Sequence, residues 1–512
     1  MILSFLFGSF GVDQFYAHHW PLAVFKLLTL GGVGVWAFVD MILWIVGDQD
    51  SMIMRSVTIV AGLLCAISLT AAVRVVPQSS NHDTTPEGFV KVDPTILDKV
   101  EITPKNLLVG RSTNPRTQVL KDRAPYSPSL MLKLVNNFNR KHTIRSYISG
   151  LDATGKVFFV SPDGKLIYPK SKEPRVPSEI MEDITLFLGP QNRPLEIPLP
   201  SFIRSGRIYF ADNDLRFFVV NMGEGDSVIQ PSVTNLQDPN ADVNWGFVEL
   251  SYMYGSLYAN ISYVDFVGIV LGMMLTETDG STQTTAGLVA DAVTKICHDL
   301  AKQKEIDKRD WTSLCIADAD EKPVRVLSPG NKHDLDPKLF DKYWDTYVNE
   351  VWKRYTAQDL TINTQTSTGH VKCRVTGNEL LCEGSDHRFA KPEGKDIWGC
   401  NSGPFAISED NSAVHAAVVP RICAAFVRST LLLDGGNIQP SLGQSSYYTV
   451  SPTNHYSRIV HSYEVDGRGY AFPYDDVNPD GKEDVSGVVS SDNAQSLTVY
   501  VGAPPPARGK SH

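Results

Sequence analysis

The sequence predicts a mainly β protein that carries an α/β insertion and is preceded by membrane helices. Short apolar runs separated by glycine and aspartate turns recur from residue 129 onward, which is the signal of a β-sandwich or β-barrel. After Gly287, apolar residues recur at helical spacing instead. Ahead of both regions, residues 1–76 are apolar enough to hold membrane helices.

Composition narrows the function classes. A chain of 512 residues exceeds one ordinary domain, and roughly 100 to 200 residues per domain gives about three units. Hydrophobic residues make up 42% and charged residues 20%, which is globular composition. The formal charge is −10 and no run of Lys or Arg occurs, which excludes nucleic acid as a partner because phosphate binding needs a concentrated basic face. A neutral polysaccharide is compatible with such a surface.

Residues 1–50 are predicted to form two short membrane helices, because they are apolar and have glycines at turn positions. Residues 11–16 and 26–40 resemble a small two-helix transmembrane module whose turn usually carries an arginine, where this chain has Gln14. Asp40 would lie inside the bilayer, where an ionisable group is either a structural feature near the interface or a functional one.

Residues 51–76 have two interpretations. The uncharged span 56–73 just reaches the length of a transmembrane helix. Met52, the apolar run and Ala71-Ala72 also match the parts of a secretory signal peptide, in which case the residues before Met52 are a gene-model addition. Both interpretations predict that the rest of the chain lies outside the cytosol, at the cell surface or in the extracellular space.

The remaining domain boundaries follow from changes in pattern. Residues 77–127 are rich in Pro, Ser, Thr and Asn without periodicity, which predicts a linker or prosegment. Residues 128–503 are predicted to form the main domain, with β structure in 128–284 and 433–503 and the α/β insertion in 285–432. Chain ends that share one fold around an insertion leave a cleft at the junction, where ligand sites are common.

Six of the seven cysteines lie in the C-terminal half, and the seventh, Cys65, lies in an apolar run. An even number after a hydrophobic leader predicts three disulfides formed in an oxidising compartment. Among the fifteen possible connectivities we expect sequential pairing. No Cys-x-x-Cys pair occurs, so we expect no zinc and no other metal or cofactor. The six are Cys297, Cys315, Cys373, Cys382, Cys400 and Cys423.

Two acids stand in apolar strand patterns on either side of Gly255. Glu249 lies within NWGFVELSY at 244–252, and Asp265 lies within NISYVDFVG at 260–268. An acid in such a strand costs stability unless something compensates it. Cleavage of a glycosidic bond needs two carboxyl groups that face each other across a groove, one to protonate the leaving oxygen and one to activate water or attack the sugar. An ion-paired or solvated pair of acids is the other interpretation.

The turn between the strands decides whether the two acids share a face. With a three-residue loop at 255–257, Glu249 lies opposite Tyr263 and Asp265 is a diagonal neighbour about 7 to 8 Å away. That distance falls within the roughly 6.5 to 9.5 Å of an inverting glycosidase. A two-residue loop would put the acids on opposite faces.

Several further motifs occur with these two strands in one order. They are CNSGPF at 400–405, LLLDGGN at 431–437, SPTNHY at 451–456 and YAFPYDDV at 470–477.

Together these motifs resemble glycoside hydrolase family 64 over residues 129–503. The resemblance implies a thaumatin-like β-barrel with an α/β domain, a wide cleft between them, and inverting endo-hydrolysis of β-1,3-glucan. It implies that Glu249 is the general acid and Asp265 the general base. A thaumatin-like protein that binds glucan without cutting it is the alternative.

The resemblance also implies four substrate-binding residues, whose hydroxyls and aromatic ring would meet sugar hydroxyls and ring faces. Ser251 and Ser262 stand where threonine is more usual, and Tyr258 stands where tryptophan is more usual. Each of the four is alternatively an ordinary strand residue. The four are Asp238, Ser251, Tyr258 and Ser262.

Some other signals carry little weight. Residues 476–484 imitate the start of a calcium loop, but Gly487 stands where its glutamate should be. The glycosylation sequon at Asn260 lies in the proposed cleft strand, so we expect it to be unmodified. His415, His455 and His461 have no paired ligand spacing and are expected to be structural.

Overall fold

The computed structural model describes residues 83–110, 130–138, 143–190, 193–199, 202–253, 255–408, 410–481 and 486–502. They belong to one compact unit that begins at residue 82. Every helix within these ranges is too short or too polar to cross a bilayer. The predicted membrane segments in 1–50 and 51–76 lie outside the described residues.

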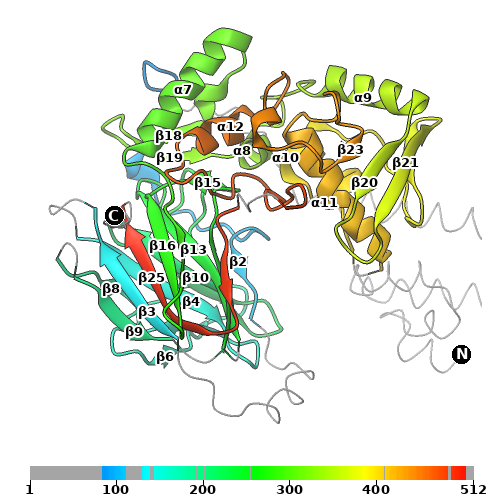
Figure 1. Cartoon of the computed structure of the whole chain (residues 1–512). Coiled ribbons are helices and arrows are strands. Elements are labelled where there is room, and N and C mark those ends of the chain that lie inside the picture. The colour runs from blue at the N-terminus through cyan, green and yellow to red at the C-terminus, as the bar shows by residue number, and fades with distance from the viewer. Residues whose placement is uncertain are drawn as a thin grey trace, which may run out of the picture. The chain divides into compact units, whose positions relative to one another are not determined.

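Two sheets that share one hydrophobic core form the centre of the β region. Alternate residues such as Leu132 and Leu134 of one sheet and Ile208 and Phe210 of the other are fully buried in the same cluster, as period-two patterning requires. In Figure 1 the last strand, β25, lies beside the early strand β3, with which it pairs in parallel. The five-stranded sheet is β17 (Thr282–Thr285), β16 (Leu271–Glu277), β25 (Ala494–Val501), β3 (Met131–Asn136) and β9 (Leu195–Pro198).

The eight-stranded sheet is the partner of that five-stranded sheet and the platform for the site. Its inner face contributes Ile208 and Phe210 to the shared core, while Tyr209 and Phe247 of its outer face belong to a second, aromatic cluster. Its strands are β24 (Val489–Ser491), β14 (Ser256–Ile261), β13 (Trp245–Met253), β10 (Phe202–Ala211), β4 (Arg145–Leu151), β5 (Val157–Val160) and β6 (Leu166–Ile167), with β8 (Leu186–Phe187) also pairing with β4.

Two four-stranded sheets contribute side chains to this aromatic cluster, including Val219, Val228, Phe266 and Ile316. They are formed by β2 (Leu107–Leu108), β12 (Asp226–Ile229), β11 (Phe218–Asn221) and β7 (Ser178–Glu179), and by β1 (Val90–Lys91), β18 (Cys315–Ala317), β19 (Pro323–Leu327) and β15 (Phe266–Val267).

The prediction of a linker over 77–127 is wrong for residues 83–110. β1 pairs in parallel with β18, and β2 pairs with β12, so this segment supplies edge strands to two sheets. The strands are only two residues long and therefore give no alternating pattern that sequence inspection could detect. A 3-10 helix, η3 (Pro94–Ile96), lies between them.

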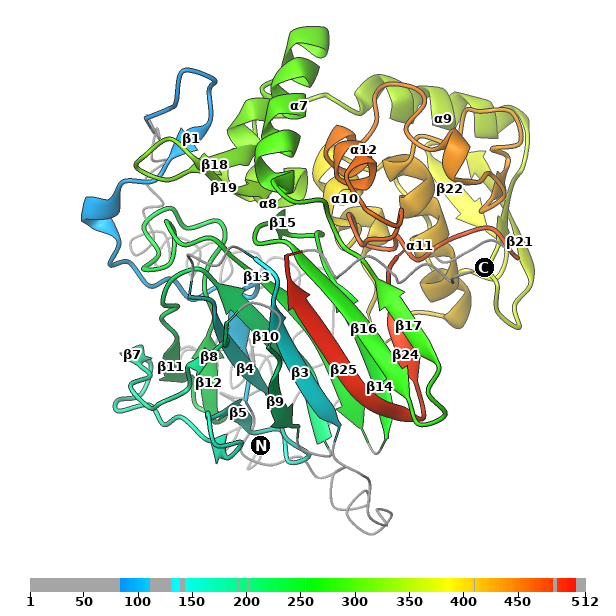
Figure 2. The same cartoon turned by 60° about the vertical axis from the view of Figure 1, so that its left-hand side comes forward.

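The α/β region contains a separate four-stranded sheet and most of the helices. Helices α9 and α11 lie against this sheet (Figure 2). The predicted helical stretches near 288–300, 339–352 and 413–429 are confirmed as α7 (Ala292–Asp307), α9 (Asp345–Ala357) and α11 (Ala413–Val427). The other elements are α8 (Pro329–Leu335), α10 (Gly394–Gly399), η5 (Trp311–Leu314), η6 (Gly403–Phe405), β20 (Leu360–Asn363), β21 (His370–Thr376), β22 (Glu379–Cys382) and β23 (Ile438–Gln439).

The return to β structure comes later than residue 433. The first strand after that point, β23, pairs with β20 of the α/β sheet, and α12 (His455–Ser462) follows η7 (Gln444–Ser446). Asn454 caps α12 by accepting a hydrogen bond from the Ser457 amide, which explains why a helix begins there. Of the strands described after that point, β24 and β25 alone rejoin the sheets of the β region.

The three disulfides have the sequential pairing. Cys297–Cys315 joins α7 to β18, Cys373–Cys382 links the hairpin of β21 and β22, and Cys400–Cys423 joins the end of α10 to α11. All six cysteines are buried. Two of these disulfides lie within the α/β region, and the third joins helix α7 to the sheet that contains β18.

Candidate active site

Glu249 lies on the outer face of the eight-stranded sheet and is paired with an arginine. In the register of β10 and β13, Arg207 lies directly opposite Glu249, so both side chains project from one face. Arg207 donates from Nη2 to Glu249 Oε1 at 3.0 Å and from Nε to the same oxygen at 3.3 Å. The acid therefore has the compensating charge that an apolar strand does not supply.

An irregularity in β10 precedes Arg207. The pairing with β13 shifts register between Ile203 and Gly206, as a β-bulge does. Ser205 has a positive φ of 48°, and a Cβ atom on Gly206 would lie 2.8 Å from the Ile203 side chain. Bulges re-aim the side chains that follow them. Here the guanidinium lies 4.3 Å from the centre of the Phe247 ring.

The turn that joins β13 to β14 has two residues, not the three that the sequence was expected to have. Met253 pairs with Ser256, and Glu249 lies opposite Asn260 rather than Tyr263. In a regular strand this register would send Asp265 to the face away from Glu249. The geometric argument that placed both acids on one strand pair is therefore wrong.

Asp265 lies outside that hairpin, because β14 ends at Ile261. Ser262 forms a bridge with Tyr470, the chain bends at residues 264 and 265, and Phe266 begins β15 in a different sheet. Strand alternation no longer decides where the Asp265 side chain points. Close packing of β15 on the start of β13 needs a glycine at 268, since a Cβ there would lie 1.9 Å from the Trp245 carbonyl oxygen.

Asn331 of α8 holds Asp265 in place. Its side-chain Nδ2 donates to the Asp265 backbone oxygen at 2.9 Å and to Oδ1 at 3.2 Å. The Ser328 amide donates to the same backbone oxygen at 2.9 Å. Asn331 is buried, so water competes little for these hydrogen bonds.

Both acids act on one guanidinium. Burial lowers the pKa of Arg207, but Tyr209, Glu249 and Asp265 outweigh burial and raise that pKa. Arg207 and Asp265 also line one pocket, so Asp265 lies near the guanidinium that binds Glu249. Arg207 Nη1 also donates to Gln230 Oε1 at 3.0 Å. The structure thus gathers Arg207, Glu249 and Asp265, which we call the site cluster.

A pocket that is open to solvent adjoins the site cluster. Arg207 and Asp265 line it, together with buried aromatic side chains from β13 and β15. Aromatic surface beside hydrogen-bonding and charged groups can hold a ligand and fix its orientation. The other lining residues are Thr103, Lys105, Asn106, Pro231, Ser232, Val233, Thr234, Trp245, Phe247, Phe266 and Asn331.

Asp238, which was expected to line the cleft, lies behind the pocket wall. It is only 3% exposed, and its carboxylate accepts hydrogen bonds from the Asn240 amide at 2.9 Å and the Ser232 amide at 3.3 Å. Burial raises its pKa. Asp238 therefore shapes the loop that carries the lining residues 231–234 instead of facing the pocket itself.

The other three expected substrate-binding residues lie along the same sheet face or at its edge. Ser251 pairs with Tyr258, which is 45% exposed, and both project from the face that carries Glu249. Ser262 forms a bridge with Tyr470, and Tyr258 contributes to the raised pKa of Tyr470, whose main cause is burial. These residues extend the polar and aromatic surface beyond the site cluster.

Sequence reasoning missed three supporting residues, namely Arg207, Gln230 and Asn331. Arg207 had a detectable signal, because it comes directly before the apolar run at residues 208–211. Gln230 and Asn331 had none, since each reaches the site through tertiary contacts with residues far away in the sequence.

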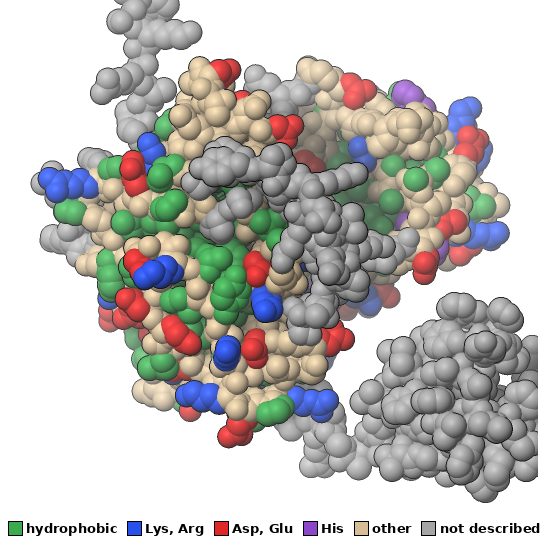
Figure 3. Space-filling model, turned by 90° about the horizontal axis from the view of Figure 1, so that it is seen from below, with side chains coloured by type: hydrophobic (Ala, Val, Ile, Leu, Met, Phe, Trp, Pro, Cys, Tyr) green, Lys and Arg blue, Asp and Glu red, His purple; other side chains and the backbone are tan. Residues whose placement is uncertain are grey.

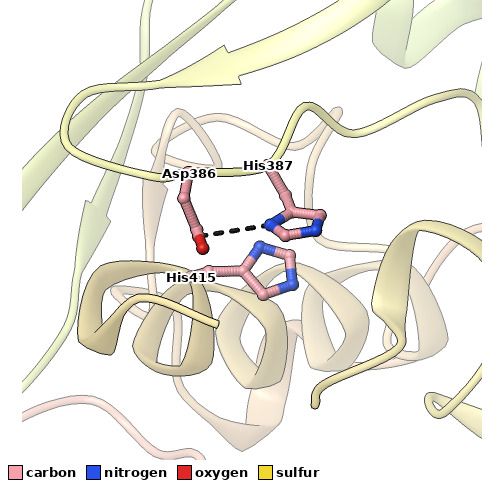
Figure 4. A group of neighbouring side chains, drawn as sticks. All are labelled: Asp386, His387 and His415. Atoms are coloured by element: carbon pink, nitrogen blue, oxygen red, sulfur yellow. Dashed lines mark ion pairs between the residues drawn. The ribbon is translucent and has the colours of Figure 1, made fainter. Parts of the chain in front are cut away.

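One group of potential metal ligands occurs among the described residues. Figure 4 shows Asp386, His387 and His415, whose ligand atoms lie within 4.8 Å of one another. Asp386 already accepts hydrogen bonds from the Ser412 amide and hydroxyl, at 2.9 and 2.7 Å, and His415 Nε2 lies 3.1 Å from the Ala406 oxygen. These contacts fasten the start of α11, and the expectation of no metal stays a prediction.

The acids of the calcium-like stretch face hydrogen-bond donors. Asp480 accepts from the side-chain amides of Asn363 and Gln365, at 2.7 and 2.9 Å. Asp476 accepts from the Tyr470 hydroxyl at 2.9 Å. These carboxylates join loops of the protein to one another.

Known proteins resemble the main domain. The family model described as β-1,3-glucanase, glycoside hydrolase family 64, matches residues 128–501. Glucan endo-1,3-β-glucosidases of Arthrobacter sp. (strain YCWD3) and Cellulosimicrobium cellulans are each 27% identical over 280 residues, which is 53% of this chain. The chain spans about half the length of these two relatives, 48% of each.

Solved structures share the fold. A laminaripentaose-producing β-1,3-glucanase in complex with laminaritetraose has a TM-score of 0.65 and 24% identity, covering 74% of this chain and 99% of its own. A family 64 β-1,3-glucanase domain from Clostridium beijerinckii has a TM-score of 0.57 and 20% identity, covering 74% of this chain and all of its own.

The N-terminus matches a second family. The TM2 domain model covers residues 1–42, in agreement with the predicted two-helix module. TM2 domain-containing protein 2 of Xenopus tropicalis is 57% identical over 47 residues, which is 9% of this chain and 24% of that protein. Because the β-1,3-glucanase model spans most of the chain, in the order and over the residues that the sequence motifs indicate, the chain belongs to glycoside hydrolase family 64.

Proposed function

We propose that this protein is an endo-acting β-1,3-glucanase that inverts the configuration of the cleaved linkage. The single observation that carries the proposal is the site cluster, in which Glu249 of β13 pairs with Arg207, and Asp265, just before β15, lines the same pocket as Arg207. Membership of the family supplies the substrate class. The face in Figure 3 intersperses Lys and Arg with Asp and Glu, which suits a neutral polysaccharide.

In the proposed reaction the acids have the roles that the resemblance implies. Glu249 donates a proton to the leaving glycosidic oxygen, while Asp265 removes a proton from a water molecule that attacks the anomeric carbon from the opposite side. The bond between that carbon and the leaving oxygen breaks as the bond to water forms. Short laminari-oligosaccharides with an inverted reducing end are the expected products.

The contact between Arg207 and Glu249 affects how Glu249 can act as the general acid. Arg207 donates to Oε1 of Glu249 from two nitrogens, so the proposal has Glu249 hand over its proton from Oε2.

An activated substrate tests this assignment of roles. An aryl β-laminaribioside with a good leaving group needs no proton donor, so Glu249→Gln should keep much more activity on it than on laminarin. Asp265→Asn should lose activity on both substrates. The reverse result for the two variants would exchange the roles.

The basic test is incubation of the purified residues 83–512 with laminarin, followed by an assay of reducing ends. Release of short oligosaccharides is the expected result. Binding of laminarin without release would instead favour the alternative, a glucan-binding protein that has lost catalysis.

We also propose that the domain acts outside the cytosol, attached to or released from a membrane. Three disulfides fit an oxidising compartment, and the N-terminus matches a TM2 domain. Mass spectrometry of the mature N-terminus tests this. A terminus near residue 73 would indicate cleavage of a signal peptide, and retention of residues 1–50 would indicate anchoring.

A further inference from the structure

The segment 83–110 lies ahead of residues 128–501, which the family model matches, yet it reaches the candidate site. Besides supplying β1 and β2, it contributes Thr103, Lys105 and Asn106 to the wall of the pocket beside Asp265. The three residues belong to a turn that leads into β2. This part of the pocket is therefore built by chain outside the matched domain.

Lys105 connects the turn to Asp265 through Asn331. Its ammonium group donates to Asn331 Oδ1 at 2.5 Å and also contacts Asp334. On its other side, Asn331 donates from Nδ2 to Asp265 Oδ1 at 3.2 Å. Asn331 is buried, and both ends of its amide are occupied.

Chemistry allows only one orientation of that amide. A lysine ammonium group has donors and no acceptor, whereas a carboxylate has acceptors and no donor. A flipped Asn331 would present its NH₂ group to Lys105 and its oxygen to Asp265, so both contacts would become repulsive. Lys105 thus reinforces the orientation in which Asn331 donates to the two oxygens of Asp265.

The same turn supports Glu249 through a second route. The backbone oxygen of Asn106 accepts a hydrogen bond from the backbone amide of Gln230 at 2.7 Å. The side-chain Oε1 of Gln230 in turn accepts from Arg207, the partner of Glu249. The turn is itself rigid, because the Asn106 side chain accepts from the amide and hydroxyl of Thr103 at 2.8 and 2.9 Å. One turn therefore touches the partners of both acids.

We propose that the segment 83–110 is a working part of the active site, in which Lys105 is a positioning residue that orients Asp265 through the Asn331 amide. This inference rests on the proposed function, because it gives Asp265 the role of the base. A positioning residue alters the rate of the chemical step and leaves sugar binding largely intact.

Kinetics on laminarin test the proposal. Lys105→Met keeps the length of the side chain and removes its donors, and should lower kcat about 10-fold with KM within about 2-fold. Lys105→Arg restores a donor and should recover most of the loss. Lys99→Met is the matched control on the same segment, because Lys99 contacts the exposed Glu101, and should behave as wild type. Wild-type kcat in Lys105→Met would overturn the inference.

A double mutant tests the route through Asn331. In the Asn331→Ala background, Lys105→Met should cause no further loss of kcat, because the residue through which it acts is gone. A full 10-fold loss in that background would show that Lys105 acts in another way and would overturn the inference.

A structural readout separates this inference from the proposed function. The side-chain NH₂ signal of Asn331 in a nitrogen-15 NMR spectrum, identified by its absence in Asn331→Asp, should shift in Lys105→Met and stay in place in Lys99→Met. An unchanged signal would contradict the inference, whatever the activity. Wild-type protein that binds laminarin without cutting it would sink the proposed function and leave this measurement to decide the orientation of the amide.

Discussion

Two charged clusters in this protein are built from similar residues but differ in burial. The site cluster of Arg207, Glu249 and Asp265 lies beside a pocket, with the side chains of Arg207 and Glu249 22% and 38% exposed. A second cluster lies in the α/β region, where the side chains of Arg428 and Asp475 are 3% and 1% exposed.

The second cluster is a network of charged groups that pair with one another inside the protein. Asp475 binds Arg428 at 2.9 Å and His461 at 3.1 Å, and the other nitrogen of His461 lies 2.9 Å from Glu464. A histidine with carboxylates at both nitrogens is an imidazolium that donates twice. Such a network holds loops together, whereas the site cluster keeps exposed surface for a ligand. Residue type alone therefore does not distinguish a structural cluster from a candidate active site.

Removal of either acid of the site cluster should have the largest effect on activity. Glu249→Gln and Asp265→Asn should each lower kcat on laminarin about 10²–10⁴-fold, the range for loss of a general acid or base. The melting temperature should change little, because neither acid belongs to a hydrophobic core. Glu196→Gln, at an exposed acid paired with Lys133, is the control and should keep full activity. An active Glu249→Gln would refute its role.

The buried cluster should respond in the opposite way. Asp475→Asn leaves Arg428 and His461 without their shared carboxylate, and loss of one partner of a buried ion pair costs about 3–5 kcal/mol of unfolding free energy. Urea unfolding measures this loss. The fraction that remains folded should have near wild-type kcat. If Asp475→Asn instead lowered kcat strongly and left the free energy of unfolding unchanged, the buried cluster would have a catalytic role and the two clusters would not differ in function.

Arg207 is a useful test of this comparison, because an arginine in an ion pair can either stabilise the fold or position a catalytic acid. Arg207→Met removes the donors to Glu249 and Gln230, and the resulting misplacement should lower kcat about 10²-fold. Kinetics and thermal unfolding of the same preparation separate the two effects. A loss of stability as large as that of Asp475→Asn, with kcat retained, would make Arg207 a structural residue.

The pH dependence of stability should report the buried cluster. Burial lowers the pKa of His461, but Asp475 and Glu464 outweigh burial and raise it to about 10, above the 6.5 of an ordinary histidine. The stabilisation is complete below about pH 6.5 and is lost as pH rises toward 10, by at most about 1.4 kcal/mol per pH unit. Urea unfolding from pH 6 to 10 should show this decline, and His461→Gln should flatten it.

Local patterns allowed part of this structure to be predicted. The helical spacing gave α7, α9 and α11, and an even number of cysteines gave three disulfides, whose sequential pairing was one option of fifteen. The thaumatin-like barrel that the resemblance implies stays a prediction.

Errors arose where a single residue or a distant contact decides the outcome. The turn before Ser256 is one residue shorter than expected, which changed the register of β14, and only the departure of the chain from the sheet after Ile261 allows Asp265 to approach Arg207. Residues 83–110 have a polar composition, yet two-residue strands and the contact between Lys105 and Asn331 integrate them into the fold. Pairing partners on other strands, which no local pattern specifies, fixed these features.

The stereochemistry of hydrolysis tests the central claim most directly. Two carboxylates with water between them release a sugar whose new reducing end has the α configuration, since the β-linkage is inverted. Proton NMR during the first minutes of laminarin digestion should therefore show the α-anomer first, followed by slow appearance of the β-anomer. Appearance of the β-anomer first would contradict this account of Glu249 and Asp265.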